Sequence, residues 1–304
     1  MKALLVANPN AGRIGGEAGP VRLAQRLQDA GLETHAVPAG VVGAVADALR
    51  QAIRREPEGQ VRVIVAGGDG TIHAALPVLV ETGVPLAILP VGSVNVLARE
   101  LGLPRELDAA IAVARDGIPR RVDVGIANGQ PFALMAGIGF DAAVVRAVAR
   151  PVKRLVGSLA YVTSGLRLLP SYPPSRFLIL ADGRQVEAQA WLAVVANAAR
   201  YTYGWRIALA RIDDGWLDLC LFRGQSTAER IGQVIAVLRG RHSTHPGVAH
   251  LRARQFRFEC EPPAPLQLDG DPAGTTPVEV GLLRSALTVL VPADPPDGRT
   301  AAAG

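Results

Sequence analysis

Residues 61–71 read VRVIVAGGDGT, a β-branched apolar run that ends in a glycine-rich turn. A short apolar run bounded by turn residues predicts a buried strand, and the helical pattern that follows continues past Pro77 to residue 81. Glycines let a backbone approach a phosphate closely, and the first turn of a helix presents N–H groups to an anion. The stretch therefore predicts a strand–loop–helix unit that suits a phosphate. Thr71 is a candidate cap of the helix, and Asp69 could organise metal and water.

The same alternation of strand and helix patterns fills the first 120 residues or so. The order β-α-β-α-β-α-β predicts a doubly wound α/β domain, with a mostly parallel sheet and helices on both faces. In such a sheet the carboxyl ends of the strands share one edge, where ligands bind. The expected strands are 2–7, 33–37, 61–66 and 85–89, and the expected helices are 20–30, 43–54 and 71–81.

The pattern changes after about residue 120, where strand-like runs dominate. Asp-Gly pairs between apolar runs are hairpin signals, so we expect an antiparallel β-rich second domain. Two helical stretches interrupt it, at 142–169 and 227–239. We expect domains at 1–123 and 124–292, followed by a disordered tail at 293–304 that lacks an apolar period. The Asp-Gly pairs lie at 182–183, 214–215 and 269–270.

Composition narrows the possible partners. A net charge of +5 suits nucleotide phosphates or an anionic membrane surface. Aromatic residues are only 4% of the chain and do not alternate with basic ones, which argues against nucleic acid. No apolar window is long enough for a spanning helix. Cys220 and Cys260 indicate two buried thiols in a reducing cytosol, and the five histidines lack metal-ligand spacing.

Three loops of small polar residues follow predicted parallel strands: 8–13 (NPNAGR), 67–71 (GGDGT) and 92–95 (GSVN). Because they share one edge of the sheet, they predict a phosphate site there. The chain has no G-x-x-x-x-G-K-[ST] loop and no protein-kinase motif set, so those two nucleotide-binding classes are excluded.

These motifs together resemble the diacylglycerol kinase catalytic domain, which bacterial soluble lipid kinases and sphingosine kinases share. NPNAG, GGDGT and PVGSVNVLARELGLP (90–104) carry the resemblance in the first domain. It continues in AGIGFDAAV (136–144), ARIDDGWLDLCLF (210–222) and LQLDGD (266–271), so it covers nearly the whole chain. The resemblance implies a first domain like that of NAD kinase and phosphofructokinase, and a β sandwich after it.

The resemblance also implies the site residues. ATP would lie against the first two loops, with Ser93 in place of the usual Thr and Asn95 matching the usual Asn. A late Asp-Gly-Glu motif, here Asp269-Gly270-Asp271, carries the general base. We expect Asp269 first, because Asp271 is shorter than the usual Glu. The nucleotide-binding residues implied are Asn8, Pro9, Asn10, Ala11, Gly12, Gly67, Gly68, Asp69, Gly70, Thr71, Ser93 and Asn95, and the catalytic carboxylates are Asp269, Asp271 and Asp69.

A structural Mg²⁺ is the second cofactor that the resemblance implies. Asp214 would hold it with the backbone carbonyls of Arg211 and Trp216, and Asp123 would join the metal and water network. The chain departs from the family at His73-Ala74, where Asn-Glu is frequent, and at Ala39 or Gly40, where a Thr contacts the nucleotide.

The expected activity is ATP-dependent phosphorylation of a membrane lipid, by default diacylglycerol to phosphatidic acid. Sphingoid bases, phosphatidylglycerol and polyprenols remain open as acceptors. The alternatives are an NAD-kinase-like enzyme with a soluble substrate and a non-catalytic nucleotide-binding regulator. We expect a cytoplasmic protein that touches the inner face of the membrane transiently. The basic and apolar stretch 142–169 is either an interfacial helix or a core helix, and the sequence is silent on oligomeric state.

Overall fold

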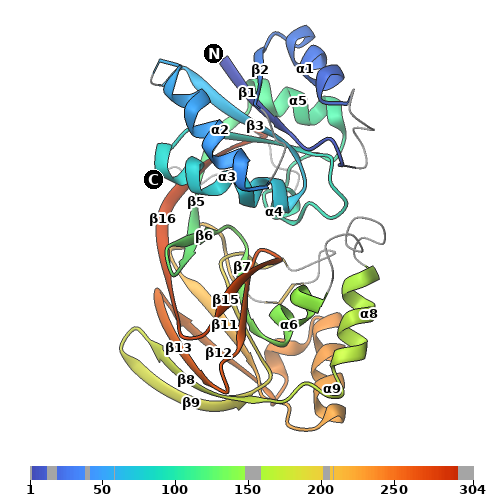
Figure 1. Ribbon diagram of the computed structural model, residues 1–304, viewed down its shortest axis with the longest axis vertical. Coiled ribbons are helices and arrows are strands. Elements are labelled where there is room, and N and C mark those ends of the chain that lie inside the picture. The colour runs from blue at the N-terminus through green and yellow to red at the C-terminus, as the bar shows by residue number, and fades with distance from the viewer. Residues whose placement is uncertain are drawn as a thin grey trace. The chain divides into compact units, whose positions relative to one another are not determined.

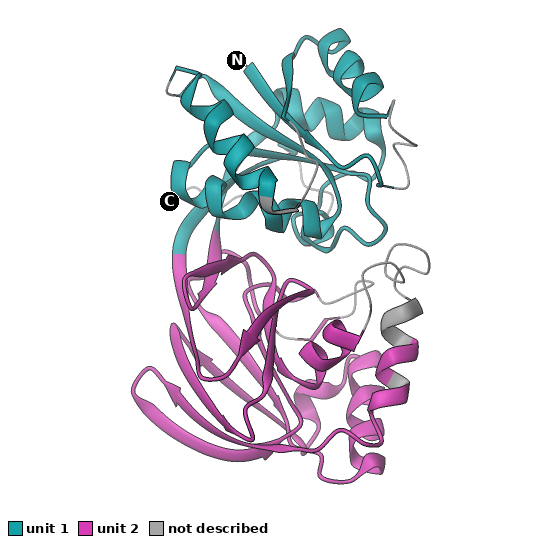
Figure 2. Ribbon diagram, in the orientation of Figure 1, with its two compact units in different colours: residues 1–122, 284–304 teal, residues 123–283 magenta. Residues whose placement is uncertain are grey.

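The computed structural model describes residues 2–11, 19–37, 42–57, 59–147, 159–200, 206–207 and 209–293. The chain forms two compact units, coloured separately in Figure 2. The first comprises residues 1–122 and 284–304, and the second comprises residues 123–283. Nearly all of the tail expected at 293–304 falls on residues 294–304, outside the described part.

Four parallel strands in the order β2-β1-β3-β4 form the sheet of the first unit (Figure 1). Successive side chains of a strand point to opposite faces. Accordingly Ala3, Leu5 and Ala7 of β1 join one buried cluster with α1 and α5, while α2 and α3 cover the other face. The doubly wound prediction is confirmed. The strands are β1 (Lys2–Ala7), β2 (Glu33–Val37), β3 (Val61–Gly67) and β4 (Leu86–Pro90), and the helices are α1 (Gly19–Asp29), α2 (Val42–Arg54), α3 (Asp69–Thr82), α4 (Val96–Glu100) and α5 (Leu107–Asp116).

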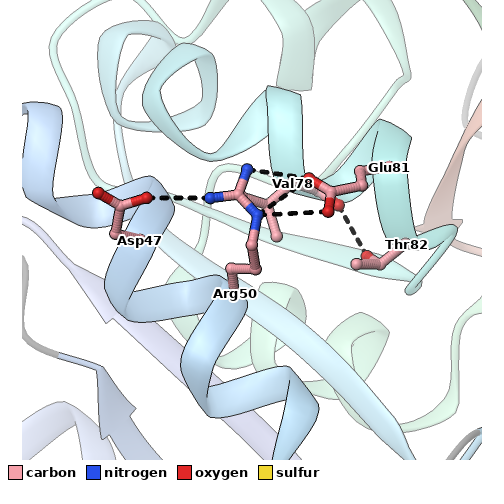
Figure 3. A network of polar contacts seen from close by, with 5 residues as sticks. All are labelled: Asp47, Arg50, Val78, Glu81 and Thr82. Atoms are coloured by element: carbon pink, nitrogen blue, oxygen red, sulfur yellow. Dashed lines mark hydrogen bonds and ion pairs between the residues drawn. The ribbon is translucent and has the colours of Figure 1, made fainter.

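An arginine on α2 connects that helix to α3, the helix that begins in the glycine-rich loop (Figure 3). Arg50 Nε and Nη2 donate to Oε2 of Glu81 over 3.0 and 2.9 Å, and Nη1 donates to Asp47 over 3.0 Å. This hydrogen-bonded pairing lowers the pKa of the Glu81 carboxyl. The network lies at the surface, so its contribution to stability is small.

The second unit is a β sandwich with one core between two sheets. One sheet is antiparallel in the order β12-β11-β10-β7-β14-β15, and the other contains β16-β13-β8-β9, with β5 joining β16 and β6. Their inward residues form a single buried cluster, to which Phe177, Phe256 and Phe258 contribute from the second sheet. The strands are β5 (Ile118–Ala127), β6 (Gln130–Phe132), β7 (Met135–Gly139), β8 (Ser175–Ala181), β9 (Arg184–Ala190), β10 (Leu192–Ala196), β11 (Leu217–Phe222), β12 (Val248–Ala253), β13 (Gln255–Glu261), β14 (Pro265–Leu268), β15 (Asp271–Thr275) and β16 (Val278–Val291).

Two of the three Asp-Gly pairs are hairpin turns. Asp182-Gly183 joins β8 to β9, and Asp269-Gly270 joins β14 to β15, with positive φ at both residues of each pair. The expectation for Asp214-Gly215 was wrong, because this turn precedes β11 without forming a hairpin. It is held by a side chain of β5 instead, as described below.

The helices of the second unit are α6 (Phe140–Ala147), α8 (Leu159–Leu168), α9 (Thr227–Leu238) and the short η2 (His242–Thr244). The expected helix at 142–169 is therefore represented by α6 and α8, while 148–158 lies outside the described residues. Within the part of the chain that the structure describes, no helix has the length and apolar character needed to cross a membrane.

The end of β16 changes the expected division of the chain. We expected residues 284–292 to belong to the second domain. Instead β16 is one long strand that pairs with β13 in its first half and with β4 through Val289 and Leu86 in its second. The chain thus returns to the first unit, because the outer edge of β4 offers unpaired backbone groups to a parallel strand.

Candidate functional site

The three loops predicted at the edge of the parallel sheet do lie together. The backbone N–H of Asn8, after β1, donates to the carbonyl of Ala66 in β3 over 3.0 Å. The N–H of Gly92, after β4, donates to the carbonyl of Gly67 over 3.2 Å. Asn8 Oδ1 also accepts from the N–H of Asn10, which shapes the first loop. Gly12, also expected here, lies outside the described residues.

Two glycines allow the second and third loops to touch. A Cβ added to Gly92 would lie 2.5 Å from Cα of Gly68 and 2.7 Å from Oδ1 of Asn95. No real side chain tolerates such distances, so the contact requires glycine at position 92. The third loop is held by Asn95 itself, whose Nδ2 donates to the carbonyls of Pro90 (3.1 Å) and Gly92 (2.7 Å). The backbone at Asn95 is left-handed, with φ of 52°, a conformation that asparagine adopts more readily than most residues.

Asp69 connects the same two loops. Its carboxylate accepts the backbone N–H of Val96 over 2.9 Å and that of Leu97 over 3.0 Å. These N–H groups begin α4 and have no partner within the helix, so the carboxylate of one loop caps the helix that follows the other. Asp69 is therefore a structural bridge, a role that local sequence did not reveal.

The first turn of α3 is arranged as an anion site would require. The helix begins at Asp69, and its N-cap, Gly68, has no side chain with which to cap it. Thr71 was the expected cap, and that expectation was wrong, because Thr71 lies inside the helix. Asn95 Oδ1 lies beside Gly68 and Gly92 and is buried, with no hydrogen-bond partner among the residues that the structure describes, so it can accept a donor from a bound molecule or water. The glycines and the free N–H groups expected at the start of a helix fit the phosphates of a nucleotide, whereas the Asn95 oxygen, as an acceptor, suits a hydroxyl, an amino group or water.

In the second unit, the carboxylate of Asp269 is fully engaged by backbone. Oδ2 accepts from the N–H of Ala133 over 2.7 Å, and Oδ1 accepts from the N–H groups of Leu134 (2.9 Å) and Met135 (3.0 Å). Asp269 stands in the left-handed region with φ of 49°, at the turn between β14 and β15. These hydrogen bonds connect the turn to the start of β7. Asp271, the first residue of β15, is half-buried.

A buried glutamine also holds this turn, and sequence reasoning did not single it out. Gln267 Oε1 accepts the N–H of Gly270 over 2.6 Å, while its Nε2 donates to Oδ2 of Asp141 over 2.6 Å. Gly137 makes room for the pair, since a Cβ there would collide with both side chains. Gln267 and Asp141 belong to the LQLDGD and AGIGFDAAV motifs, which was the available signal.

Asp214, the expected metal ligand, has protein partners in the structure. Asp214 Oδ1 accepts the N–H of Trp216 over 3.1 Å, and Oδ2 forms an ion pair with Arg252 of β12. Arg252 Nε also lies 3.6 Å from Oδ2 of Asp218, and its guanidinium lies 5.7 Å from the centre of the Trp216 ring. Arg211 approaches Asp213 instead, with Nε 3.7 Å from Oδ1. In this structure the Arg252 guanidinium supplies the positive charge beside Asp214.

Asp123 positions this turn. It is buried, and its Oδ2 accepts the N–H of Gly215 over 2.7 Å, while its own N–H donates to Ile212 over 2.7 Å. Among the described residues, no three Asp, Glu, His or Cys side chains form a cluster that could hold a metal. Asp123 therefore connects the Asp214-Gly215 turn to β5 through hydrogen bonds.

Comparison with known proteins agrees with both units. The diacylglycerol kinase catalytic domain matches residues 2–127, and the YegS C-terminal NAD kinase beta sandwich-like domain matches residues 135–291. The chain belongs to the diacylglycerol kinase and YegS family of lipid kinases. The resemblance noted from the motifs is thereby confirmed.

Relatives of this lipid kinase extend over almost its whole length. A diacylglycerol kinase of Bacillus subtilis is 30% identical over 96% of each chain. A protein of Chromohalobacter salexigens named "Probable lipid kinase YegS-like" is 33% identical over 88% of this chain and 86% of its own. The crystal structure of a diacylglycerol kinase from Bacillus anthracis superposes with a TM-score of 0.76 at 26% identity, covering 95% of this chain and 96% of that one.

Proposed function

We propose that this chain transfers the γ-phosphate of ATP to the hydroxyl of a membrane lipid, with diacylglycerol as the acceptor. The observation that carries the phosphate half is the contact of the loops at Gly68 and Gly92, next to the start of α3, whose N-cap is a glycine. The acceptor half is supported by the relatives, one of which is named a diacylglycerol kinase over the same length. Within the described residues of the site, no feature favours NAD or a purely regulatory role.

The first unit would hold the nucleotide. The phosphates would lie at the start of α3, where backbone N–H groups and the helix dipole favour negative charge. Asn8, Asn10 and the exposed Ser93, which belong to the other two loops, would offer further polar groups to the nucleotide. Asp69 contributes indirectly, because it fixes α4 to the glycine-rich loop. Mg²⁺ would accompany ATP and neutralise charge on its β- and γ-phosphates.

The second unit would supply the general base, and we propose Asp271 for that role. In the transfer, the lipid oxygen bonds to the γ-phosphorus, the bond from that phosphorus to the bridging oxygen of ADP breaks, and the hydroxyl proton passes to the carboxylate. Asp269 is the weaker candidate, contrary to our first expectation, because both its oxygens already accept backbone N–H groups. A well-placed base contributes about 10²–10⁴-fold to the rate of such a reaction.

The proposal is tested by incubating the chain with γ-labelled ATP, Mg²⁺ and separate mixed micelles of diacylglycerol, sphingosine, phosphatidylglycerol and a polyprenol. We expect label in phosphatidic acid, and almost none with Asp271→Asn, which should still bind ATP. NAD in solution serves as the competing acceptor. Label in phosphorylated NAD, or in no product while ATP binds, would refute the proposed activity.

A further inference from the structure

Helix α9 has an unusual distribution of side chains. Its buried residues are Arg230, Gln233 and Ala236, whereas Ile231, Ile235 and Leu238 are 45%, 40% and 47% exposed. A surface helix normally buries its apolar face and exposes its polar one. Helix α9 departs from this rule, because it buries two polar side chains and exposes three large apolar ones, so its outward residues need an explanation other than packing within the unit.

Hydrogen bonds of buried polar side chains fix α9 in place. Arg230 donates to four backbone carbonyls, and Gln233 accepts from Trp191 Nε1 over 2.6 Å and donates to the carbonyl of Gly247 over 3.0 Å. At its start, Ser226 and Glu229 form a reciprocal capping box. The helix is thus held firmly without help from its exposed apolar side chains. The carbonyls that Arg230 binds are those of Leu169, Tyr172, Gly224 and Gln225.

The exposed apolar residues form one continuous stripe. Ile231, Ile235 and Leu238 are spaced by four and three positions, which places them on one face of a helix. Three of the seven large hydrophobic side chains that are exposed in the described part of the chain belong to this stripe. Figure 1 shows α9 at the surface of the second unit. A stripe of this kind marks an interaction surface.

The flanks of the stripe are positively charged. Residues 223–247 contain one glutamate and, besides the buried Arg230, three arginines. Arg239 and Arg241 are exposed just beyond the end of α9. The single Glu229 carboxylate accepts the backbone N–H groups of Gln225 and Ser226, so it is turned toward the helix start. An apolar stripe beside exposed arginines is complementary to anionic lipid, whose headgroups attract cations and whose acyl region accepts apolar side chains.

We propose that the outward face of α9 docks on an anionic lipid surface, with Ile231, Ile235 and Leu238 entering the headgroup boundary and Arg239 and Arg241 contacting the headgroups. The proposal rests on the proposed function, because an enzyme whose acceptor is a membrane lipid must reach the bilayer. It assigns membrane contact to α9, whereas the sequence suggested 142–169.

The experiment is co-sedimentation of the full chain with vesicles of phosphatidylcholine alone or mixed with phosphatidylglycerol. The test variant is Ile231→Gln/Ile235→Gln/Leu238→Gln, because glutamine is a good helix former and keeps the fold. The matched control is Val21→Gln/Leu209→Gln, which removes two apolar side chains that are each 72% exposed elsewhere. A third variant, Arg239→Glu/Arg241→Glu, reverses the flanking charge.

We expect the stripe variant to bind the mixed vesicles about 10- to 100-fold more weakly, given the usual free energy of burying such side chains. The charge-reversed variant should lose the preference for phosphatidylglycerol, and the control should bind like the unaltered chain. Equal binding by the stripe variant and the unaltered chain would overturn the proposal. So would a dimer that dissociates on the stripe substitutions, since the face would then pair two copies.

Sedimentation requires no turnover, so it remains readable if lipid phosphorylation fails. If the lipid-kinase proposal is right and α9 docks, the stripe variant should phosphorylate a short-chain diacylglycerol in solution at the normal rate. Its activity on vesicle-embedded diacylglycerol should fall with its binding. Loss of both activities would mean that the substitutions act on the site itself and would refute the docking role.

Discussion

Gln267 donates a hydrogen bond of 2.6 Å to Oδ2 of Asp141, although 126 residues separate the two in the chain. The amide oxygen of the same side chain accepts the N–H of Gly270, so the amide nitrogen and the amide oxygen of Gln267 bind different partners. Gln267 and Asp141 are both buried. The first turn of α6 is thereby connected to the Asp269-Gly270-Asp271 turn, and the position of the proposed base depends on this connection.

We predict that Gln267→Met lowers kcat for lipid phosphorylation about tenfold or more while KM for ATP stays near normal, because the base loses its support in the second unit. Stability should fall by about 1–3 kcal/mol, since the N–H of Gly270 and the Asp141 carboxylate lose a partner. The control is Gln233→Met, which removes two hydrogen bonds of another buried glutamine. It should cost similar stability but leave kcat on a water-soluble diacylglycerol unchanged. Equal kcat losses in the two variants would contradict the positioning role.

The two carboxylates of the turn should respond differently to loss of charge. Asp269→Asn places an N–H₂ group against backbone N–H groups, so we expect a stability loss of about 1–3 kcal/mol in urea denaturation. Asp271→Asn should reduce phosphate transfer about 10²–10⁴-fold. An active Asp271→Asn variant, with Asp269→Asn folded but inactive, would return the base to Asp269.

The elements were predictable where the information is local. The strands and helices of the first unit could be predicted because the apolar spacing of each element, and the turn residues that end it, lie within its own short segment of sequence. The return of β16 to β4 was not visible, since residues 287–291 read as an ordinary strand, separate from 277–283, and the partner lies some 200 residues earlier, at Leu86. Strand partners are decided by sheet edges that only the folded chain presents.

The site was predictable as a set of motifs, but the roles within it were not. Asp69 and Asp269 look like exposed loop carboxylates in the sequence. Their partners are 27 or more residues away, and only the structure shows that these partners are backbone N–H groups. Asp214 matches a metal ligand by resemblance, yet its partner is Arg252, 38 residues further on. A motif identifies the chemistry that a family uses, whereas the atom facing each carboxylate depends on long-range packing.

Asp69 should matter for stability as well as for activity. We predict that Asp69→Ala abolishes phosphate transfer and lowers the free energy of unfolding by about 1–2 kcal/mol, because α4 loses the acceptor of its first N–H groups. Asp108→Asn, a highly exposed carboxylate in the first turn of α5, is the control and should change neither quantity much. Thermal melting and the labelled-ATP assay measure the two effects. Normal turnover by folded Asp69→Ala would refute the phosphate site.

The pairing of Arg252 predicts how Mg²⁺ affects the free protein. Without nucleotide, Mg²⁺ should leave the melting temperature of the unaltered chain unchanged, because a guanidinium already faces Asp214. Arg252→Met leaves Asp214 and Asp218 without that charge, so this variant should be less stable in EDTA and regain stability with Mg²⁺. Arg254→Met, which loses a cation over the Trp216 ring, is the control and should not respond to Mg²⁺. If Mg²⁺ raised the melting temperature of the unaltered chain, the result would favour a metal site at Asp214.

Asp218 gives a prediction for the dependence of stability on pH. Burial raises the pKa of its carboxyl, and the negative charge of Asp214 adds to the rise, while Arg252 opposes it. A carboxyl whose pKa is raised by folding binds its proton more tightly in the folded state. Its ionised form therefore costs stability above the folded pKa, and the cost disappears as pH falls below the unfolded value of about 4.

Asp218→Asn should therefore raise the melting temperature at neutral pH, because it removes the cost of the buried ionised carboxylate. The advantage over the unaltered chain should shrink as pH falls toward about 4. Glu81→Gln is the contrasting variant, because Arg50 lowers the pKa of Glu81 (Figure 3). Its substitution should cost stability at neutral pH, and that cost should also fade on acidification. If Asp218→Asn were destabilising at neutral pH, the ion pair with Arg252 would outweigh the burial of the carboxylate.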